Sequence, residues 1–248
     1  MAWPHFISAC QLLVKSDITL WIDTNLSIES RVREFAEKIP AAMVENLYIS
    51  LHITERERHK QIDTFIKLMA LLQNKGYKTQ VNYVMDPRLL HRFAKDSEFF
   101  KTHGIELMAK PYKGVHRLKL YPESYTKGER RTILDSSPDA FRRTIFYPHG
   151  ARCDAGRSLV RLLPDGTVTR CVADRTKQGT INTGIVLNNE SLPCTVPCCS
   201  CFGWDLIEDE NKKELMRQNL TDKPPLQSIA RRYIGYYKRR IKKKLKQR

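Results

Sequence analysis

The sequence lacks both a long hydrophobic run and a secretion signal. No apolar stretch approaches the roughly 20 residues needed to span a bilayer. The N-terminus, Met-Ala-Trp-Pro-His-Phe, has neither the basic flank nor the apolar stretch of a signal peptide. Internal repeats and low-complexity segments are also missing, apart from the C-terminal tail. These absences predict a cytoplasmic protein. Because 41% of the 248 residues are hydrophobic, the chain can form one large domain, or a medium and a small one.

Acidic residues are missing from the last part of the chain. Residues 231–248 contain ten Lys or Arg and no Asp or Glu, whereas the whole chain has a net charge of +16. The rest of the protein is therefore only mildly basic. Three tyrosines and a thin apolar stripe accompany the basic residues, so this tail could bind nucleic acid or an anionic membrane surface. The alternative is a tail that is simply solvated.

Cysteine is scarce in the first 150 residues, where Cys10 stands alone. The other six cysteines gather in the C-terminal third: Cys153, Cys171, Cys194, Cys198, Cys199 and Cys201. In a cytosolic chain of this length, clustered cysteines favour metal binding over disulfides.

The first hundred residues alternate between helical and strand patterns. Apolar residues at helical spacing predict helices over residues 6–14, 31–39, 58–74 and 89–102, and apolar runs predict strands over 18–23, 46–52, 79–85 and 105–109. Such alternation is typical of a parallel α/β sheet, whose ligands bind at the carboxyl ends of the strands. The polar residues predicted at those ends are Thr24, Asn25, Ser50, His52, Asn82, Tyr83 and Lys110. Each could equally be an ordinary turn or capping residue.

The four predicted segments differ in composition. Residues 1–112 form the α/β part, and residues 113–149, rich in Lys, Arg, Tyr and Pro, are predicted to be a loop-rich bridge with at most a short helix near 140–144. Residues 150–207 contain the clustered cysteines, and residues 208–248 form a helical basic tail.

The cysteine region contains a predicted β-hairpin. Residues 158–163 and 167–172 alternate like strands on either side of the turn Pro164-Asp165-Gly166. Such a hairpin brings Cys153 and Cys171 towards one site.

Thiolates are the preferred ligands of both iron–sulfur clusters and zinc. A zinc ribbon has two tight Cys-x-x-Cys knuckles, which the wide spacing of Cys153 and Cys171 fits poorly. The preferred cluster ligands are these two cysteines and Cys194, with one or more of Cys198, Cys199 and Cys201. Adjacent cysteines point in different directions in most backbones, so only one of Cys198 and Cys199 is expected to bind a given iron.

The segment Cys153-Asp-Ala-Gly…Leu-Pro-Asp-Gly166-Thr-Val-Thr-Arg-Cys171 resembles the opening of the SPASM/twitch domain of radical SAM enzymes. Twelve residues separate Cys153 from Gly166, and four separate Gly166 from Cys171. The compact group that begins at Cys194 is similar to the downstream half of that site, but it is shorter than the full SPASM pattern. The resemblance therefore implies one auxiliary [4Fe-4S] cluster rather than two.

The N-terminal half is similar to the later part of a radical SAM partial barrel. Three segments, Ile22-Asp-Thr24-Asn25, Tyr48-Ile-Ser50-Leu-His52 and Gln80-Val-Asn82-Tyr-Val, resemble successive strands of that barrel. The resemblance extends over roughly residues 5–207. It implies an incomplete (β/α)6 partial barrel followed by a small Cys-rich hairpin domain, with Thr24, Asn25, Ser50 and Asn82 at the S-adenosylmethionine site.

The chain departs from the family at its hallmark. The Cys-x3-Cys-x2-Cys loop of the catalytic cluster and the Gly-Gly-Glu segment are absent, and both would precede Met1. We therefore expect a shortened chain that has no catalytic activity by itself. Its family's substrates range from peptides to small metabolites. The alternatives are a non-catalytic iron–sulfur carrier or scaffold, and a zinc-bearing nucleic-acid-binding module.

Overall fold

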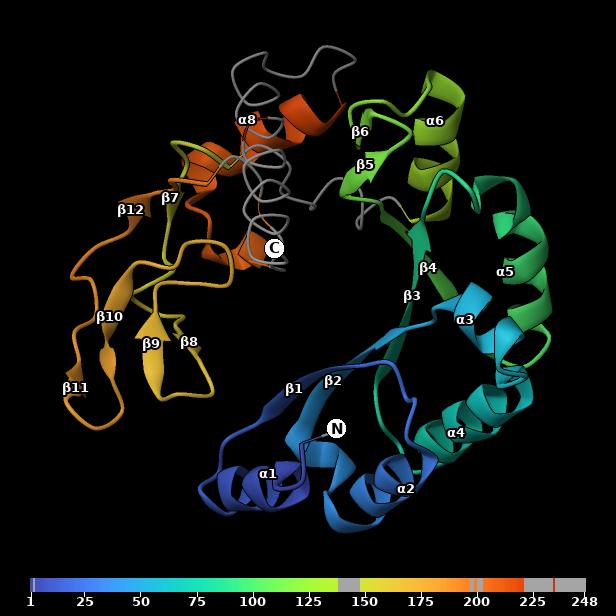
Figure 1. The fold of residues 1–248 in the computed structure, drawn as a ribbon, viewed down its shortest axis with the longest axis horizontal. Coiled ribbons are helices and arrows are strands. Elements are labelled where there is room, and N and C mark those ends of the chain that lie inside the picture. Colours follow the sequence, from blue (N-terminus) through green and yellow to red (C-terminus); the bar gives the residue numbers. More distant parts are fainter. Residues whose placement is uncertain (2, 138–147, 197–198, 200–202, 221–233, 235–248) are drawn as a thin grey trace, which may run out of the picture. The chain divides into compact units, whose positions relative to one another are not determined.

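The computed structural model describes residues 1, 3–137, 148–196, 199, 203–220 and 234. The chain divides into two compact units (Figure 1). The first comprises Met1–Tyr112 with Asp135–Ser137, and the second comprises Lys113–Leu134 with Pro138–Arg248. Within the described parts of both units, no helix is long and apolar enough to cross a membrane.

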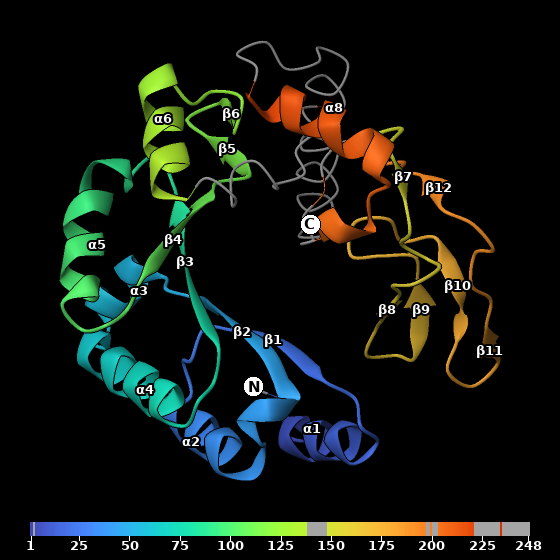
Figure 2. The same cartoon turned by 180° about the vertical axis from the view of Figure 1, so that it is seen from behind.

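The first unit contains a four-stranded parallel sheet, which confirms the predicted mixed α/β class. Its strands are paired in chain order: β1 (Leu20–Thr24), β2 (Val44–Ser50), β3 (Thr79–Met85) and β4 (Leu107–Pro111). The helices are α1 (Phe6–Lys15), α2 (Glu29–Lys38), α3 (Ile53–Arg58), α4 (Ile62–Asn74) and α5 (Phe93–Lys101), with 3-10 turns η1 (Ala41–Met43) and η2 (Leu90–Arg92). Figures 1 and 2 show α1, α2, α4 and α5 along one face of the curved sheet.

The two faces of the sheet differ in chemistry because successive side chains of a strand point to opposite faces. The face towards the helices is apolar and buried, and its core includes Leu47, Ile49, Val81, Tyr83 and Ala109. The opposite face is mostly polar and aromatic, with Trp21, Asp23, Asn46, Tyr48, Ser50, Gln80, Asn82 and Lys110 beside the apolar Val84 and Met108. A sheet covered by helices on both faces would carry continuous apolar strands. This sheet leaves a polar face for a ligand or another part of the chain.

The helix predicted over residues 58–74 is wrong at its start. Two helices, α3 and α4, occupy residues 53–74, and the chain turns between them at Lys60, whose φ is 54°. This turn folds α3 back on α4, so that the guanidinium of Arg56 lies 4.2 Å from the centre of the Phe65 ring. The end of α4 agrees with the prediction, since Gly76 follows it with a left-handed φ of 82°.

The bridge predicted over residues 113–149 contains more structure than expected. Strands β5 (Gly114–His116) and β6 (Lys119–Tyr121) form a hairpin, and α6 spans Lys127–Ser136. The helix begins with a capping box, in which the Glu129 N–H donates to the Thr126 Oγ1 at 3.2 Å and the Thr126 N–H donates to Glu129 Oε2 at 2.7 Å. The prediction of at most one short helix is therefore wrong. The helix predicted near 140–144 lies outside the described residues.

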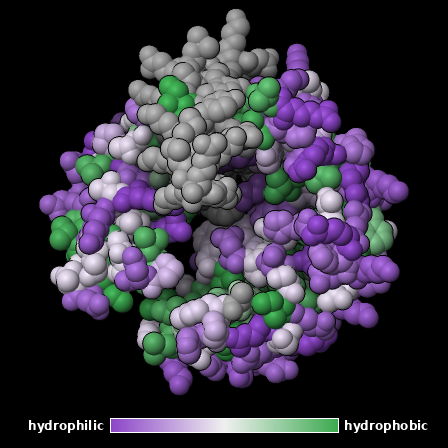
Figure 3. All heavy atoms as spheres, viewed as in Figure 1, coloured by the Kyte–Doolittle hydropathy of each residue, from purple (hydrophilic) through white to green (hydrophobic). Residues whose placement is uncertain are grey.

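The C-terminal unit confirms the predicted hairpin, with shorter strands. Strand β8 (Arg161–Leu162) pairs antiparallel with β9 (Thr167–Thr169). Two further strands, β10 (Lys177–Thr180) and β11 (Gly184–Ile185), extend this sheet in the order β11-β10-β9-β8. A separate pair joins β7 (Arg152–Cys153) to β12 (Leu192–Pro193), followed by the 3-10 turn η3 (Gly203–Leu206) and α8 (Asp209–Leu220). Figure 3 shows hydrophobic residues exposed among hydrophilic ones over the β8–β11 sheet. Of residues 208–248, predicted to be a helical basic tail, the structure describes 208–220, which contain α8, and Ile234, whereas the ten basic residues of 231–248 lie outside the described residues.

Candidate functional site

The four residues predicted at the S-adenosylmethionine site lie around two cavities at the carboxyl ends of the strands. Thr24, Asn25 and Ser50 line a cavity of about 400 Å³. Ser50 and Asn82 line a second cavity of about 420 Å³. Ser50 and His52 belong to both, so the cavities adjoin at the end of β2. The sheet register brings Ser50 directly opposite Asn82.

Thr24 and Asn25 also shape the turn after β1. The Leu26 N–H donates to Thr24 Oγ1 and the Ser27 N–H donates to Asn25 Oδ1, both at 3.2 Å. These are the local bonds that threonine and asparagine typically make in turns. Thr24 and Asn25 therefore both stabilise the turn and line the cavity.

Arg56 was not predicted to contribute, yet it fixes the loops that carry the cavity walls. Its side chain is buried, its Nε donates to the Leu51 carbonyl at 2.7 Å, and its Nη2 donates to the Asn25 carbonyl. Burial lowers its pKa to about 10. The loops after β1 and β2 are thereby held together through one guanidinium. A sequence signal for this role is lacking because the contact with Asn25 spans 31 residues.

The polar face of the sheet carries an aromatic pair and a carboxylate. Trp21 stacks on Tyr48 with ring centres 5.2 Å apart and planes at 14°. Asp23, which lines the first cavity, lies opposite Tyr48 in the β1–β2 register. Desolvation raises the pKa of Asp23, while the charge of Lys110 acts to lower it. On the same face, Asn46 Oδ1 is buried and accepts no hydrogen bond from the described residues.

Three predicted cysteine ligands come from segments that meet in the C-terminal unit. Cys153 lies on β7 opposite Leu192, and Cys194 follows β12. The Cys194 N–H donates to the Ala151 carbonyl and the Gly150 N–H donates to the Cys194 carbonyl, both at 2.8 Å. Burial raises the pKa of Cys194 to about 11, and the neighbouring thiols of Cys153 and Cys171 add to this.

A buried cluster also contains Cys199. This residue packs in the same group as Cys153 and Cys171, together with Trp204 and Ile207. All three cysteines are thus buried in one packed cluster and largely shielded from water. Among the described residues, however, no three His, Cys, Asp or Glu side chains are arranged to hold a metal ion. Cys198 and Cys201 lie outside the described residues, so the complete ligand set stays a prediction.

The residues around Cys171 suit a thiolate ligand. The Asp174 N–H donates to Cys171 Sγ at 3.1 Å, and hydrogen bonds to sulfur are a main means by which proteins tune iron–sulfur sites. The Asp174 carboxylate accepts from Thr176 and from the Thr195 hydroxyl at 2.8 Å. The donor type of Cys171, its burial and its hydrogen bonding therefore suit a single thiolate ligand.

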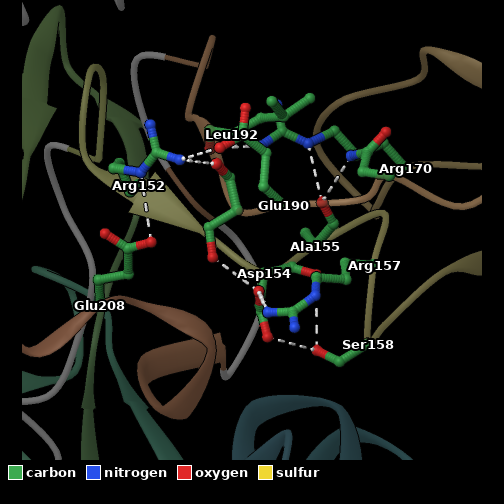
Figure 4. Close-up of polar contacts among 11 residues, drawn as sticks. Arg152, Asp154, Ala155, Arg157, Ser158, Arg170, Glu190, Leu192 and Glu208 are labelled. Carbon is green, nitrogen blue, oxygen red and sulfur yellow. Dashed lines mark hydrogen bonds and ion pairs between the residues drawn. The ribbon is translucent and has the colours of Figure 1, made fainter.

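Arg152 adds a second set of contacts beside Cys153. Its Nε donates to Glu208 at 3.2 Å and its Nη2 to Glu190 at 3.1 Å (Figure 4). The Arg152 N–H donates to Asn211 Oδ1 at 2.8 Å. These bonds connect β7 to the segment before β12 and to the start of α8.

No protein-family model matches the chain, and no curated protein matches its sequence.

Proposed function

We propose that the chain is a radical SAM/SPASM-type iron–sulfur protein whose C-terminal unit holds one auxiliary [4Fe-4S] cluster. The ligands are Cys153, Cys171 and Cys194, with a fourth from Cys198, Cys199 or Cys201. The observation that supports this proposal is the pairing of β7, which carries Cys153, with β12, which directly precedes Cys194, together with the influence of the Cys153 and Cys171 thiols on the Cys194 pKa. A bound cluster of this kind exchanges single electrons.

The first unit supports the same family assignment. Its parallel sheet places Thr24, Asn25, Ser50 and Asn82 around two adjoining cavities, in the position where open α/β sheets bind ligands. We propose that these residues bind the polar groups of S-adenosylmethionine. Arg56 keeps the walls in place by holding the loops after β1 and β2. The family uses S-adenosylmethionine for radical chemistry, and the substrate here is a peptide or a small metabolite.

A non-catalytic iron–sulfur protein is the second candidate. It is favoured by the absence of a Cys-x3-Cys-x2-Cys loop from the sequence. Cys10, the remaining cysteine, is buried on α1 and lies far in sequence from the others. We propose that the chain by itself does not cleave S-adenosylmethionine, and that it serves as an electron carrier or scaffold when alone.

Anaerobic purification followed by metal, sulfide and absorption analysis tests the cluster. We expect a brown protein with iron and acid-labile sulfide and without zinc. A colourless protein that holds zinc would instead support the nucleic-acid-binding alternative and reject the cluster. Incubation with S-adenosylmethionine and a reductant then tests catalysis. We expect no 5′-deoxyadenosine, and its formation would reject the proposed inactivity.

A further inference from the structure

We propose that Arg170 is a positioning residue that holds the three cysteine-bearing segments together and raises the reduction potential of the cluster that they bind. This inference rests on the proposed iron–sulfur function. It concerns a residue that makes no metal bond itself and that acts through the backbone beside each ligand.

The guanidinium of Arg170 contacts four acceptors in three segments. Its Nε donates to the Ala155 carbonyl at 3.0 Å and its Nη2 to the Leu192 carbonyl at 2.7 Å (Figure 4). Its Nη1 donates to the Pro193 carbonyl and to Asp174 Oδ2, both at 3.1 Å. The side chain is only 7% exposed. An arginine carries five N–H donors, so these bonds use almost its full capacity.

Each of these contacts lies next to a cysteine in sequence. Arg170 directly precedes Cys171, Ala155 follows Cys153 by two residues, and Pro193 directly precedes Cys194. One side chain therefore fixes the distances between the three segments that supply the first three proposed ligands. Asp174 completes the arrangement, since its carboxylate accepts from Arg170 while its N–H donates to Cys171 Sγ.

The backbone around this contact is shaped to admit the arginine. Gly156 has a φ of 90°, which favours glycine, and a Cβ added there would lie 2.9 Å from Arg170 Cγ and 2.8 Å from Gln178 Nε2. The Gln178 side chain donates to the Gly156 carbonyl at 2.8 Å. Gly156 is therefore the position at which the chain after Cys153 passes close to the stem of Arg170.

Lysine cannot replace this geometry. The planar guanidinium aims its donors in fixed directions, whereas an ammonium is a compact charge with three donors. In the variant Arg170→Lys the positive charge remains, but the single ammonium nitrogen cannot donate to the carbonyls of Ala155, Leu192 and Pro193 from the three positions that the guanidinium nitrogens occupy. The variant therefore separates the positioning role from the charge.

The charge itself acts on the electron affinity of the site. Adding an electron makes a thiolate-bound cluster more negative, and a nearby buried cation favours that state more strongly than an exposed one would. Loss of the charge should therefore lower the reduction potential. We expect Arg170→Gln to reduce the equilibrium constant for one-electron reduction by about tenfold, which corresponds to a shift of 59 mV.

The test compares full-length Arg170→Lys, Arg170→Gln and Arg157→Gln after anaerobic reconstitution with ferrous iron and sulfide. Arg157 is a matched control because it is an arginine of the same segment whose exposed side chain contacts Asp154 at 3.2 Å. Iron and sulfide per chain report positioning, and the midpoint potential of the loaded fraction reports the charge. Circular dichroism verifies that each variant folds.

We expect Arg157→Gln to match the wild type in both measurements. Arg170→Lys should bind at least twofold less iron with a near-native potential, and Arg170→Gln should bind less iron at a lower potential. If both Arg170 variants bind as much iron as the wild type and have the same midpoint potential, the inference about Arg170 is overturned. The proposal of a cluster would still stand in that case. If Arg170→Gln fails to fold, the iron content of Arg170→Lys decides, and native loading there overturns the positioning role. A wild-type protein without iron would overturn the proposed function itself.

Discussion

The backbone N–H of Asp174 donates a hydrogen bond to the Sγ of Cys171 at 3.1 Å, and the carboxylate of the same Asp174 accepts from Arg170. Asp174 thus connects Cys171, a proposed ligand, to the guanidinium of Arg170, which donates to carbonyls close in sequence to the other two cysteines. The arrangement gives the cysteine region a hydrogen-bonded framework. Grouped thiols alone would not specify how the three segments meet.

Replacing Cys171 should remove most of the bound iron. The Cys171→Ser variant loses a soft thiolate ligand, and we expect iron per chain to fall by at least fivefold. The control is Cys10→Ser, because Cys10 lies on α1 in the first unit. Equal iron content in the two variants would show that Cys171 is not a ligand. Colorimetric iron and sulfide assays on anaerobically prepared protein provide the measurement.

Replacing Ser50 or Asn82 should weaken binding of S-adenosylmethionine. Each side chain lines a cavity at the strand ends, and a lost hydrogen bond typically costs about 1 kcal/mol. We therefore expect a roughly fivefold higher Kd for Ser50→Ala and for Asn82→Ala by calorimetry, since 1.4 kcal/mol is tenfold. Ser16→Ala is the control, because the Ser16 hydroxyl donates to the Leu12 carbonyl on the surface. Unchanged affinity in both cavity variants would place the ligand elsewhere.

Replacing Arg56 should destabilise the first unit. In Arg56→Met the carbonyls of Leu51 and Asn25 lose their donor, and the ring of Phe65 loses its cationic neighbour. An unsatisfied buried polar group costs about 1–3 kcal/mol, so we expect the free energy of unfolding to fall by about 3 kcal/mol. Urea unfolding measures the change. Arg33→Met is the control, since Arg33 forms an exposed i,i+4 ion pair with Glu29. If Arg56→Met lowers the free energy of unfolding no more than Arg33→Met does, the proposed role of Arg56 is contradicted.

Asp23 should reduce stability at neutral pH. Desolvation raises the pKa of Asp23 in the folded state. The folded protein therefore binds this proton more tightly than the unfolded chain, and the gain in stability is fully present below the unfolded-state pKa. That gain is lost as the pH rises through the folded-state pKa. Asp23→Asn mimics the neutral form. We expect a higher Tm than the wild type at pH 7 and a vanishing difference near pH 3. A lower Tm at pH 7 would show that attraction to Lys110 outweighs desolvation.

Regular elements of the first unit were predictable because their patterns are local. The strand predicted at residues 79–85 matches β3, since apolar residues there are bounded by polar ones and by the Asp86-Pro87 turn. The break at Lys60 was not predictable, because it serves the contact of Arg56 with Phe65. The start of α6 was missed, although Thr126 and Glu129 have the spacing of a capping box and could have indicated it.

The sequence selected the candidate site residues, whereas the residues that support them structurally were not predicted. The cysteines and the strand-end residues are chemically conspicuous, so residue type and spacing suffice to select them. Arg170 resembles any other arginine in this basic chain. Its importance arises from contacts 15 to 23 residues away, and no local pattern encodes these.

Iron X-ray absorption of the anaerobically purified full-length chain tests the central claim most directly. A [4Fe-4S] cluster on these cysteines predicts sulfur neighbours around iron together with iron–iron scattering, and both should diminish in Cys171→Ser. A chain that contains zinc with sulfur neighbours and no metal–metal scattering, or that contains no metal, would contradict the account.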